Sequence, residues 1–345
     1  MRIIMTHGYM LSGTGSNIYV QSLCRALVSE GHDVHLLCQD PDPLSYDFVG
    51  KAATVDVGGV EELGEQETPY QGRCVIYRPE IGDLLPVYVY DEYPGWRVKT
   101  FLDLTEEELD NYLRRNVEAL KTVLGVSDAE AVITNHSVPG PLIARRALEG
   151  SDLPYVSIVH GSCLQYVSRK SEMYMGLTRE GLESARDILA LSSHSAGTIA
   201  EDFPDLEDRT HSLPGGVDTE LFHPDAFDLG VLEHLEGGPG RGQVQRNSLR
   251  EALESSGHAG ELAGALRAVA ESYDARSHDK DAGERLKSFL DREGPLVVYV
   301  GKLIHSKGVH SLISALSRVR KETGARLLVI GFGTFREGLE ALTFS

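Results

Sequence analysis

Two glycine-containing loops carry the residue types that bind anionic ligands. The first, His7–Asn17 (HGYMLSGTGSN), follows a short apolar segment and precedes an amphipathic one. Glycine lets the backbone approach a ligand closely, and the free amides at the start of a helix attract negative charge. We predict that Gly13, Gly15 and Ser16 receive phosphate oxygens. A purely structural turn is the alternative, because glycine turns are common where a strand meets a helix.

The second loop, Gly301–Gly308 (GKLIHSKG), places two lysines in a chain whose formal net charge is -19. It follows the apolar segment Leu296–Val300 and precedes a segment with helical spacing. Lys302 and Lys307 can neutralise a diphosphate while the helix amides receive it, as a nucleoside-diphosphate leaving group requires. Two solvated surface lysines are the alternative interpretation.

A helix is expected directly after the first loop, capped by Ser16 or Asn17 and ended by Gly31. The residues expected to face inward are Ile18, Leu23, Ala26 and Leu27. Gly13 and Gly15 also begin a GxGxxG pattern, but Ile18 stands at its third glycine position. A nicotinamide-dependent dehydrogenase is therefore the weaker hypothesis.

Short apolar runs alternate with amphipathic stretches along the chain, which predicts an α/β fold with parallel strands and crossover helices. The clearest helix spans Thr105–Leu124 and begins with a capping box between Thr105 and Glu108. A segment rich in Tyr, Leu85–Phe101, is suited to stacking on a sugar or to packing the domain. The predicted strands are Arg2–Thr6, Val34–Cys38, Ala131–Thr134, Tyr155–His160 and Ile188–Ser192.

A length of 345 residues favours two domains, which we place at residues 1–213 and 214–345. The strand, loop and helix order restarts at Leu296, and the second domain contains a helical and flexible insertion at residues 225–293. A capping box between Ser248 and Glu251 predicts one or two helices there. Only two strands follow the insertion, too few to bury both faces of a sheet, so this domain is expected to be incomplete.

Composition narrows the class of protein. The strongly negative net charge disfavours an extended surface for nucleic acid or anionic lipid. No apolar run is long enough for a transmembrane helix and no signal peptide is recognisable, which predicts a cytoplasmic protein. Nothing in the sequence indicates an oligomeric state. The four cysteines, expected to be free buried thiols, are Cys24, Cys38, Cys74 and Cys163.

Taken together, the motifs resemble those of the retaining, nucleotide-sugar-dependent glycosyltransferases of family 4 (group 1). GKLIHSKG is similar to the family's donor-phosphate loop GRLxxxKG, and residues 213–224 (LPGGVDTELFHP) are similar to its PNGVDxxxFxP segment. Val329–Gly333 (VIGFG) matches the strand and GxG turn that come next in the family, and the opening loop matches its first glycine loop. The resemblance covers nearly all of the chain outside the insertion.

The resemblance implies a GT-B-like α/β fold in which two Rossmann-like domains face a cleft. It also implies roles for individual residues. His160, which ends a VHG-like strand, would lie beside the reacting sugar as the catalytic residue. The donor diphosphate would contact Lys302 and Lys307, together with the glycine loops that include Gly13, Gly15, Ser16, Gly301 and Gly333. Asn17, Asn135 and His136 would line the acceptor side of the cleft.

The implied reaction transfers a sugar from a nucleotide-diphosphate sugar to an acceptor hydroxyl with retention of anomeric configuration. Neither a metal nor another cofactor is expected, because lysines and helix amides take the place of a divalent ion in this family. Two departures stand out: Lys302 replaces the family's Arg, and the family's pair of glutamates beyond the GxG turn has no counterpart after Gly333. A noncatalytic remnant or binding protein that retains the acceptor domain is therefore the alternative.

Overall fold

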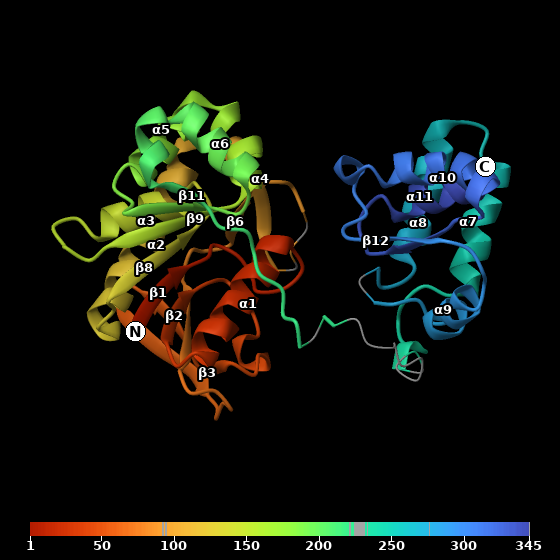
Figure 1. The fold of residues 1–345 in the computed structure, drawn as a ribbon. Helices are drawn as coiled ribbons and strands as arrows, with labels where there is room; N and C mark the ends of the chain where they lie inside the picture. Colours follow the sequence, from red (N-terminus) through yellow and green to blue (C-terminus); the bar gives the residue numbers. More distant parts are fainter. Residues whose placement is uncertain are drawn as a thin grey trace. The chain divides into compact units, whose positions relative to one another are not determined.

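The computed structural model describes residues 1–91, 93, 95–220, 222–223, 232, 234–275 and 277–344. The chain divides into two compact units, Met1–Thr219 (unit 1) and Glu220–Ser345 (unit 2), which are described separately below (Figure 1). Unit 1 extends six residues beyond the boundary drawn from the sequence. Leu221 and Pro224, which belong to the predicted 213–224 motif, lie outside the described residues.

Unit 1 is built on a nine-stranded sheet with the order β11-β10-β9-β8-β1-β2-β5-β3-β4. All neighbouring strands pair in parallel except β3 and β4, which form an antiparallel pair at one edge. All five predicted strands are present, with ends that differ by two residues or fewer. The strands are β1 Arg2–Thr6, β2 Asp33–Leu37, β3 Val49–Asp56, β4 Gly59–Glu65, β5 Cys74–Pro79, β8 Ala131–Asn135, β9 Tyr155–Val159, β10 Asp187–Ala190 and β11 Thr210–Ser212.

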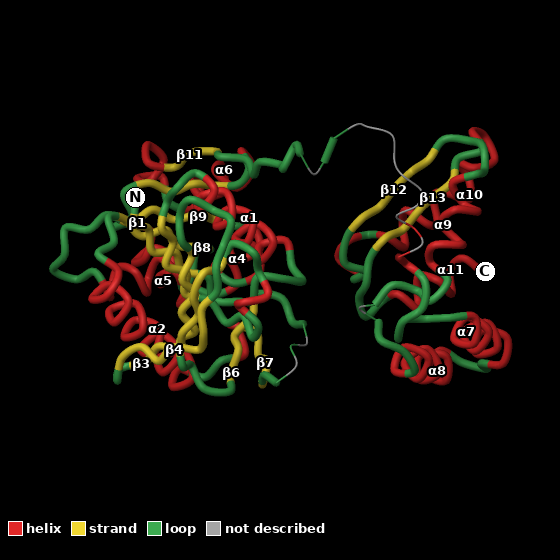
Figure 2. The backbone as a smooth tube through the Cα atoms, turned by 90° about the horizontal axis from the view of Figure 1, so that it is seen from below, coloured by secondary structure: helices red, strands yellow, loops and turns green. Residues whose placement is uncertain are grey.

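Helices cover both faces of this sheet. Side chains alternate between the two faces along a strand, so Ile4 and Met5 of β1 belong to different apolar clusters. Figures 1 and 2 show α1 on one side of the sheet and α2 on the other. The helices are α1 Gly15–Ser29, α2 Glu106–Ser127, α3 Gly140–Ala147, α4 Gly161–Tyr166, α5 Glu172–Leu182 and α6 Ser193–Asp202.

The strand order of unit 1 reverses direction at β1. From β1 the chain crosses to β2 on one side, and the later strands β8, β9, β10 and β11 follow in sequence on the other. Loops that leave the carboxyl ends of β1 and β8 therefore diverge to opposite faces, which opens a crevice at this point of the sheet. Sequence segments more than 120 residues apart meet there, since β1 and β8 pair directly.

The Tyr-rich segment forms a second, two-stranded parallel sheet of β6 (Leu84–Val87) and β7 (Arg97–Thr100). Residues 92 and 94 within it lie outside the described residues. Trp96 and Tyr88 are partly buried and pack against the main apolar cluster, and Phe101 belongs to it. Much of this segment therefore packs the domain.

Unit 2 contains two parallel strands, β12 (Leu296–Val300) and β13 (Arg326–Ile330), among its described residues. Two of its helices, α10 and α11, follow these strands, and the other three lie in the predicted insertion, where one or two were expected. The capping box assigned to Ser248 is wrong: α7 begins five residues earlier, and the Ser248 hydroxyl donates to the carbonyl of Val244 at 3.1 Å. The helices are α7 Gln243–Ser255, α8 Ala259–Glu271, α9 Ala282–Leu290, α10 Val309–Thr323 and α11 Arg336–Phe344.

The short sheet of unit 2 leaves apolar side chains uncovered. Val298 of β12 is 50% exposed and Val300 is 72% exposed. The compact apolar cluster lies instead where β12 and β13 end, around Leu303, Val309 and Leu339. Apolar packing in this part of unit 2 is therefore concentrated at the glycine loop and the start of α10, next to the strand ends.

The predicted capping box at the start of α2 is confirmed, and it generates a stability prediction. Thr105 Oγ1 accepts from the amide of Glu108 at 3.2 Å, and the Glu108 carboxylate accepts from the amide of Thr105 at 3.0 Å. We expect Thr105→Ala to lower the free energy of unfolding by about 1 kcal/mol. Thr105→Ser, which keeps the hydroxyl, is the control. Urea unfolding followed by fluorescence of Trp96, the single tryptophan, reports on unit 1. Equal midpoints for both variants would contradict a capping role.

Candidate functional site

Three imidazoles meet at the carboxyl ends of β1, β8 and β9. Each strand is followed directly by one of them: His7 follows β1, His136 follows β8 and His160 follows β9. The ring centroids of His7 and His136 are 5.7 Å apart with nearly parallel planes, and those of His136 and His160 are 4.6 Å apart. All three side chains are more than nine-tenths buried. The crevice predicted by the strand order thus contains a stack of imidazoles.

Two asparagines orient the outer imidazoles. Asn135 donates through Nδ2 to the carbonyl of Thr6 at 3.1 Å, so its Oδ1 is the atom that faces His160 Nε2, also at 3.1 Å. Asn17 likewise donates to the carbonyl of Ser12 at 2.6 Å and presents Oδ1 to His7 Nε2 at 3.1 Å. An amide oxygen only accepts, so both histidines carry their proton on Nε2 in this network.

The middle imidazole, His136, is held in an unusual state. Its backbone has φ of +71°, a left-handed conformation that is uncommon for residues other than glycine. Neither ring nitrogen has a hydrogen-bond partner among the described residues, although the side chain is only 2% exposed. Its ring lies 4.5 Å from that of Tyr88 and 5.8 Å from that of Tyr9. Strain and unpaired polar atoms of this kind are concentrated at functional sites.

Burial keeps the stack uncharged. Desolvation lowers the pKa of His7 to about 4 and that of His160 to about 3, and repulsion from His7 lowers the pKa of His160 further. Desolvation also lowers the pKa of His136 well below its usual value, with repulsion from His160 and His7 as the next causes. At neutral pH the crevice therefore offers neutral hydrogen-bonding rings and no positive charge from histidine.

The first glycine loop lies beside this stack. Gly13 has φ of +91°, and no described heavy atom beyond its chain neighbours lies within 4 Å of where a Cβ of Gly13 would stand; the same holds for Gly15. The ring of Tyr19, on the first turn of α1, is 5.4 Å from that of His160 in an edge-to-face arrangement. The beginning of α1 therefore lies close to His160, and its free amides follow directly after the open loop.

Two expectations for this loop are corrected. Thr14, not Ser16 or Asn17, is the N-cap residue of α1, and it makes no side-chain capping bond. Asn17 is fully buried because it orients His7, while Ile18 is 47% exposed and does not face inward. Leu23 and Leu27 are partly buried and pack against an apolar cluster as predicted, but the face is shifted, and its fully buried residues are Val20, Cys24 and Val28.

In unit 2 the two predicted glycine motifs lie at the same edge, because β12 and β13 are parallel. The amide of Leu303 donates to the carbonyl of Phe332 at 2.8 Å, and the amide of Gly301 donates to that of Ile330 at 3.0 Å. A Cβ on Gly333 would stand 2.5 Å from the carbonyl oxygen of Leu303. Gly333 therefore allows the loops to touch backbone to backbone, a contact that fixes the lysine loop.

The lysine loop ends at the first turn of α10. Gly308 adopts φ of +68° and precedes the helix, whose first amides have no carbonyl partner within it. Lys307 is exposed beside this turn, and Lys302 places its Nζ 6.0 Å from the ring centroid of Phe332. Gly301, Lys302 and Lys307 thus belong to one loop that leads directly into the free amides of α10, and such amides are suited to an anion.

The described residues contain no group of three or more His, Cys, Asp or Glu side chains that could hold a metal ion. All four cysteines are free and buried, as predicted. None of the described helices is long and apolar enough to span a membrane.

The predicted site residues fall into three groups. Asn17, Asn135, His136 and His160 come together at the strand ends of unit 1, the open glycine loop lies next to them, and the lysine loop lies in unit 2. Sequence reasoning did not single out His7, Tyr9 or Tyr88 as site residues. The signal for His7 was its position directly after a predicted strand, equivalent to that of His136 after β8.

Comparison with known proteins identifies the family. The sequence model of Glycosyltransferase Family 4 matches residues 13–221, more than half of the chain. The chain therefore belongs to this glycosyltransferase family, as the motifs indicated. No curated protein sequence matches the chain.

One solved structure confirms the GT-B type of α/β fold. The chain is similar to a sucrose-phosphate synthase from Thermosynechococcus elongatus, with 17% identity, a TM-score of 0.51 and coverage of 95% of this chain. It spans 61% of that synthase's length. An α,α-trehalose-phosphate synthase (UDP-forming) from Burkholderia vietnamiensis has 12% identity and a TM-score of 0.49, with 99% of this chain and 68% of that chain covered.

The buried imidazoles predict a loss of stability in acid. The folded-state pKa values of His7 and His160, about 4 and about 3, lie below the ordinary value of 6.5. Between these values the unfolded chain binds protons that the folded chain does not. Stability is therefore present above pH 6.5 and lost as pH falls toward 4, by roughly 3 kcal/mol per imidazole. Urea unfolding followed by Trp96 fluorescence at pH 7, 5.5 and 4.5 measures this loss.

Paired variants separate the imidazoles from the carboxylates, which also titrate in acid. The slope of the unfolding free energy against pH reports the number of protons taken up on unfolding. In His160→Gln this number should fall by about one, because the glutamine side chain does not titrate. His194→Gln, at an exposed position, should leave it unchanged. A His160→Gln variant with the parent's pH dependence would show that this ring is not held neutral.

Proposed function

We propose that this chain is a retaining glycosyltransferase that moves a sugar from a nucleotide-diphosphate sugar to an acceptor hydroxyl without a metal ion. Family membership supports the general reaction. The observation that carries the donor assignment is the loop with Lys302 and Lys307, which ends at the free amides of α10. Positive charge and helix amides together match the diphosphate that leaves during transfer.

The donor loop is prepared for this role before a ligand arrives. Contacts to the Gly331–Gly333 turn fix the backbone of Leu303, and the hydroxyl of Tyr299 donates to the carbonyl of Lys302 at 3.0 Å. A loop held in place loses little entropy on binding. Lys302 provides charge where the family has arginine, but it lacks the planar fork that makes two parallel bonds to phosphate.

His160 would act at the sugar as a neutral hydrogen-bonding ring. Its Nε2 is engaged by Asn135, which leaves Nδ1 as an acceptor for a sugar hydroxyl. A ring with a pKa of about 3 is a poor base at neutral pH. As the acceptor oxygen bonds to the anomeric carbon and the bond to phosphate breaks, the acceptor proton would pass to the departing phosphate oxygen.

A binding protein without turnover is the second candidate function. The uncovered apolar side chains of strand β12 favour it, because a strand packed on both faces would bury them. Membership of the glycosyltransferase family argues against the dehydrogenase hypothesis.

The donor site is tested by calorimetric titration of UDP, GDP and ADP into the full chain in the presence of EDTA. We expect saturable binding of at least one nucleotide, and a loss of roughly 100-fold in affinity when Lys302 and Lys307 are both changed to Ala, because each charged hydrogen bond contributes about 1.5–3 kcal/mol. The matched control is Arg318→Ala with Lys321→Ala, which removes the same charge from exposed positions near the other end of α10.

Three outcomes are decisive. Binding that is lost only in the loop variant supports the donor site, and sugar transfer from the bound donor's nucleotide sugar supports the enzyme. Binding without transfer or hydrolysis from any nucleotide sugar supports the binding protein. A folded chain that binds none of the three nucleotides contradicts the donor assignment.

A further inference from the structure

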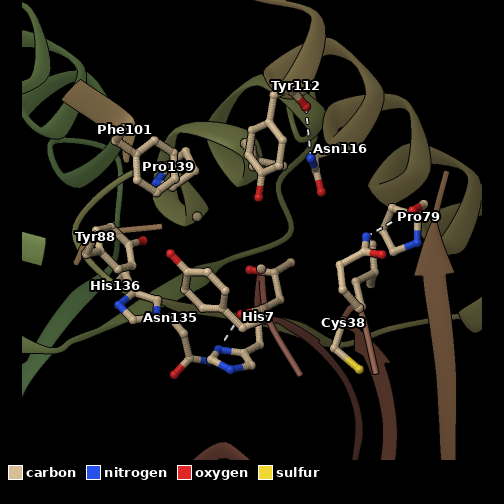
Figure 3. Close-up of a pocket in the computed structure, with 17 residues that line it drawn as sticks. His7, Cys38, Pro79, Tyr88, Phe101, Tyr112, Asn116, Asn135, His136 and Pro139 are labelled. Carbon is tan, nitrogen blue, oxygen red and sulfur yellow. Dashed lines mark hydrogen bonds between the residues drawn. The ribbon is translucent and has the colours of Figure 1, made fainter. Parts of the chain in front are cut away.

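A buried chamber lies behind the imidazole stack in unit 1. Its volume is about 30 Å³, and its walls include Thr6, Tyr9, Tyr88, Tyr112, Asn116 and His136 (Figure 3). The residues come from β1, β8, the segment after β6, and α2. A volume of this size holds about two water molecules. The chamber is therefore a small, partly open part of the crevice at the strand ends.

Polar atoms without partners surround this chamber. Thr6 Oγ1, Tyr9 Oη and both ring nitrogens of His136 are buried and make no hydrogen bond to any described residue. Figure 3 shows the Tyr112 hydroxyl and the Asn116 carboxamide oxygen pointing into the same space. Buried polar groups are almost always paired with protein or ordered water. Several unpaired polar atoms around one small space therefore indicate that a polar molecule or group occupies it.

The occupant must be uncharged. The wall residues include no Lys, Arg, Asp or Glu. Burial lowers the pKa of His136 well below its usual value, so this ring supplies no positive charge at neutral pH. Much of the remaining wall is apolar, and it includes the aromatic residues Phe101 and Tyr112, only 2% and 4% exposed. An ion placed here would lose its hydration without gaining an opposite charge.

We propose that the chamber is a binding site for uncharged hydroxyl groups, occupied by water in the free protein and by a hydroxyl-bearing arm of the acceptor during transfer. Hydroxyl groups both donate and accept, which suits the mixture of Thr, Tyr, Asn and neutral His atoms. The second part rests on the proposed function. It assigns the acceptor to the neutral polyols and sugars, with at least one arm that carries no phosphate or carboxylate.

Hydration is tested through the sign of a stability change. Thr6→Val keeps the side-chain shape and removes one unpaired hydroxyl. If water occupies the chamber, the substitution removes a hydrogen bond and should lower the urea midpoint followed by Trp96 fluorescence. If the chamber is dry, it removes a buried unpaired group, and the midpoint should be unchanged or raised, which would overturn the proposal. Thr134→Val is the matched control, because its hydroxyl donates to the carbonyl of Val156 and its loss lowers the midpoint in either case.

A crystal of the full chain tests the occupant directly. We expect ordered water within hydrogen-bonding distance of Thr6 Oγ1 and a ring nitrogen of His136. Xenon density in the chamber under pressure would overturn the proposal, because xenon enters dry apolar cavities.

The acceptor role is tested with a matched pair of probes, glycerol and glycerol 3-phosphate, which differ only in the charged group. Glycerol should displace the ordered water in soaked crystals and shift the His136 ring resonances saturably in solution, and glycerol 3-phosphate should do so at least tenfold more weakly. Tyr9→Phe should weaken the glycerol effect. Water that glycerol does not displace, or equal effects of both probes, would overturn the acceptor role. Neither result depends on nucleotide binding to unit 2. A failure of the acceptor role is therefore distinguishable from a failure of the donor site, which the calorimetric titration tests.

Discussion

The exclusion of water from three imidazoles is the constraint on which unit 1 depends. The strand order brings the ends of β1, β8 and β9 together, and His7, His136 and His160 fill the crevice that results. Burial of stacked rings disfavours the charged state, so all three rings are held neutral, and in the two outer rings a hydrogen-bond partner fixes which nitrogen carries the proton. Asn17 and Asn135 provide that placement. The strand order therefore determines the burial of the rings, and burial together with the asparagine bonds determines their protonation.

In unit 2 the candidate site is positively charged, whereas the imidazole stack of unit 1 is neutral. The glycine loop of unit 2 carries Lys302 and Lys307 and leads into the start of α10, where the helix amides are free. The glycines of the neighbouring turn serve this arrangement indirectly: a Cβ on Gly331 would stand 1.9 Å from the carbonyl oxygen of Gly301. In the proposed transfer, unit 1 would receive hydroxyl groups at its neutral site and unit 2 would receive the diphosphate at its lysine loop, so the two proposed sites belong to different units.

Much of the architecture follows from local sequence signals. The Thr105 capping box and the apolar strands were predictable because they depend on neighbours in the chain. The α1 face was predicted out of phase because Asn17 is buried for the sake of His7, a tertiary hydrogen bond that periodicity does not reveal. In the same way, the left-handed backbone and unpaired ring of His136 depend on packing between distant segments. The family resemblance pointed to His136 and His160, and only the structure shows that they stack with His7.

The neutrality and tautomers of the stack are the central claim, and long-range proton–nitrogen NMR of the histidine rings measures both. At pH 5.5 the account predicts neutral rings for His7, His136 and His160, with the proton on Nε2 in His7 and His160. Imidazolium shifts for any of these three rings at that pH, or Nδ1-protonated tautomers in the outer two, would contradict it.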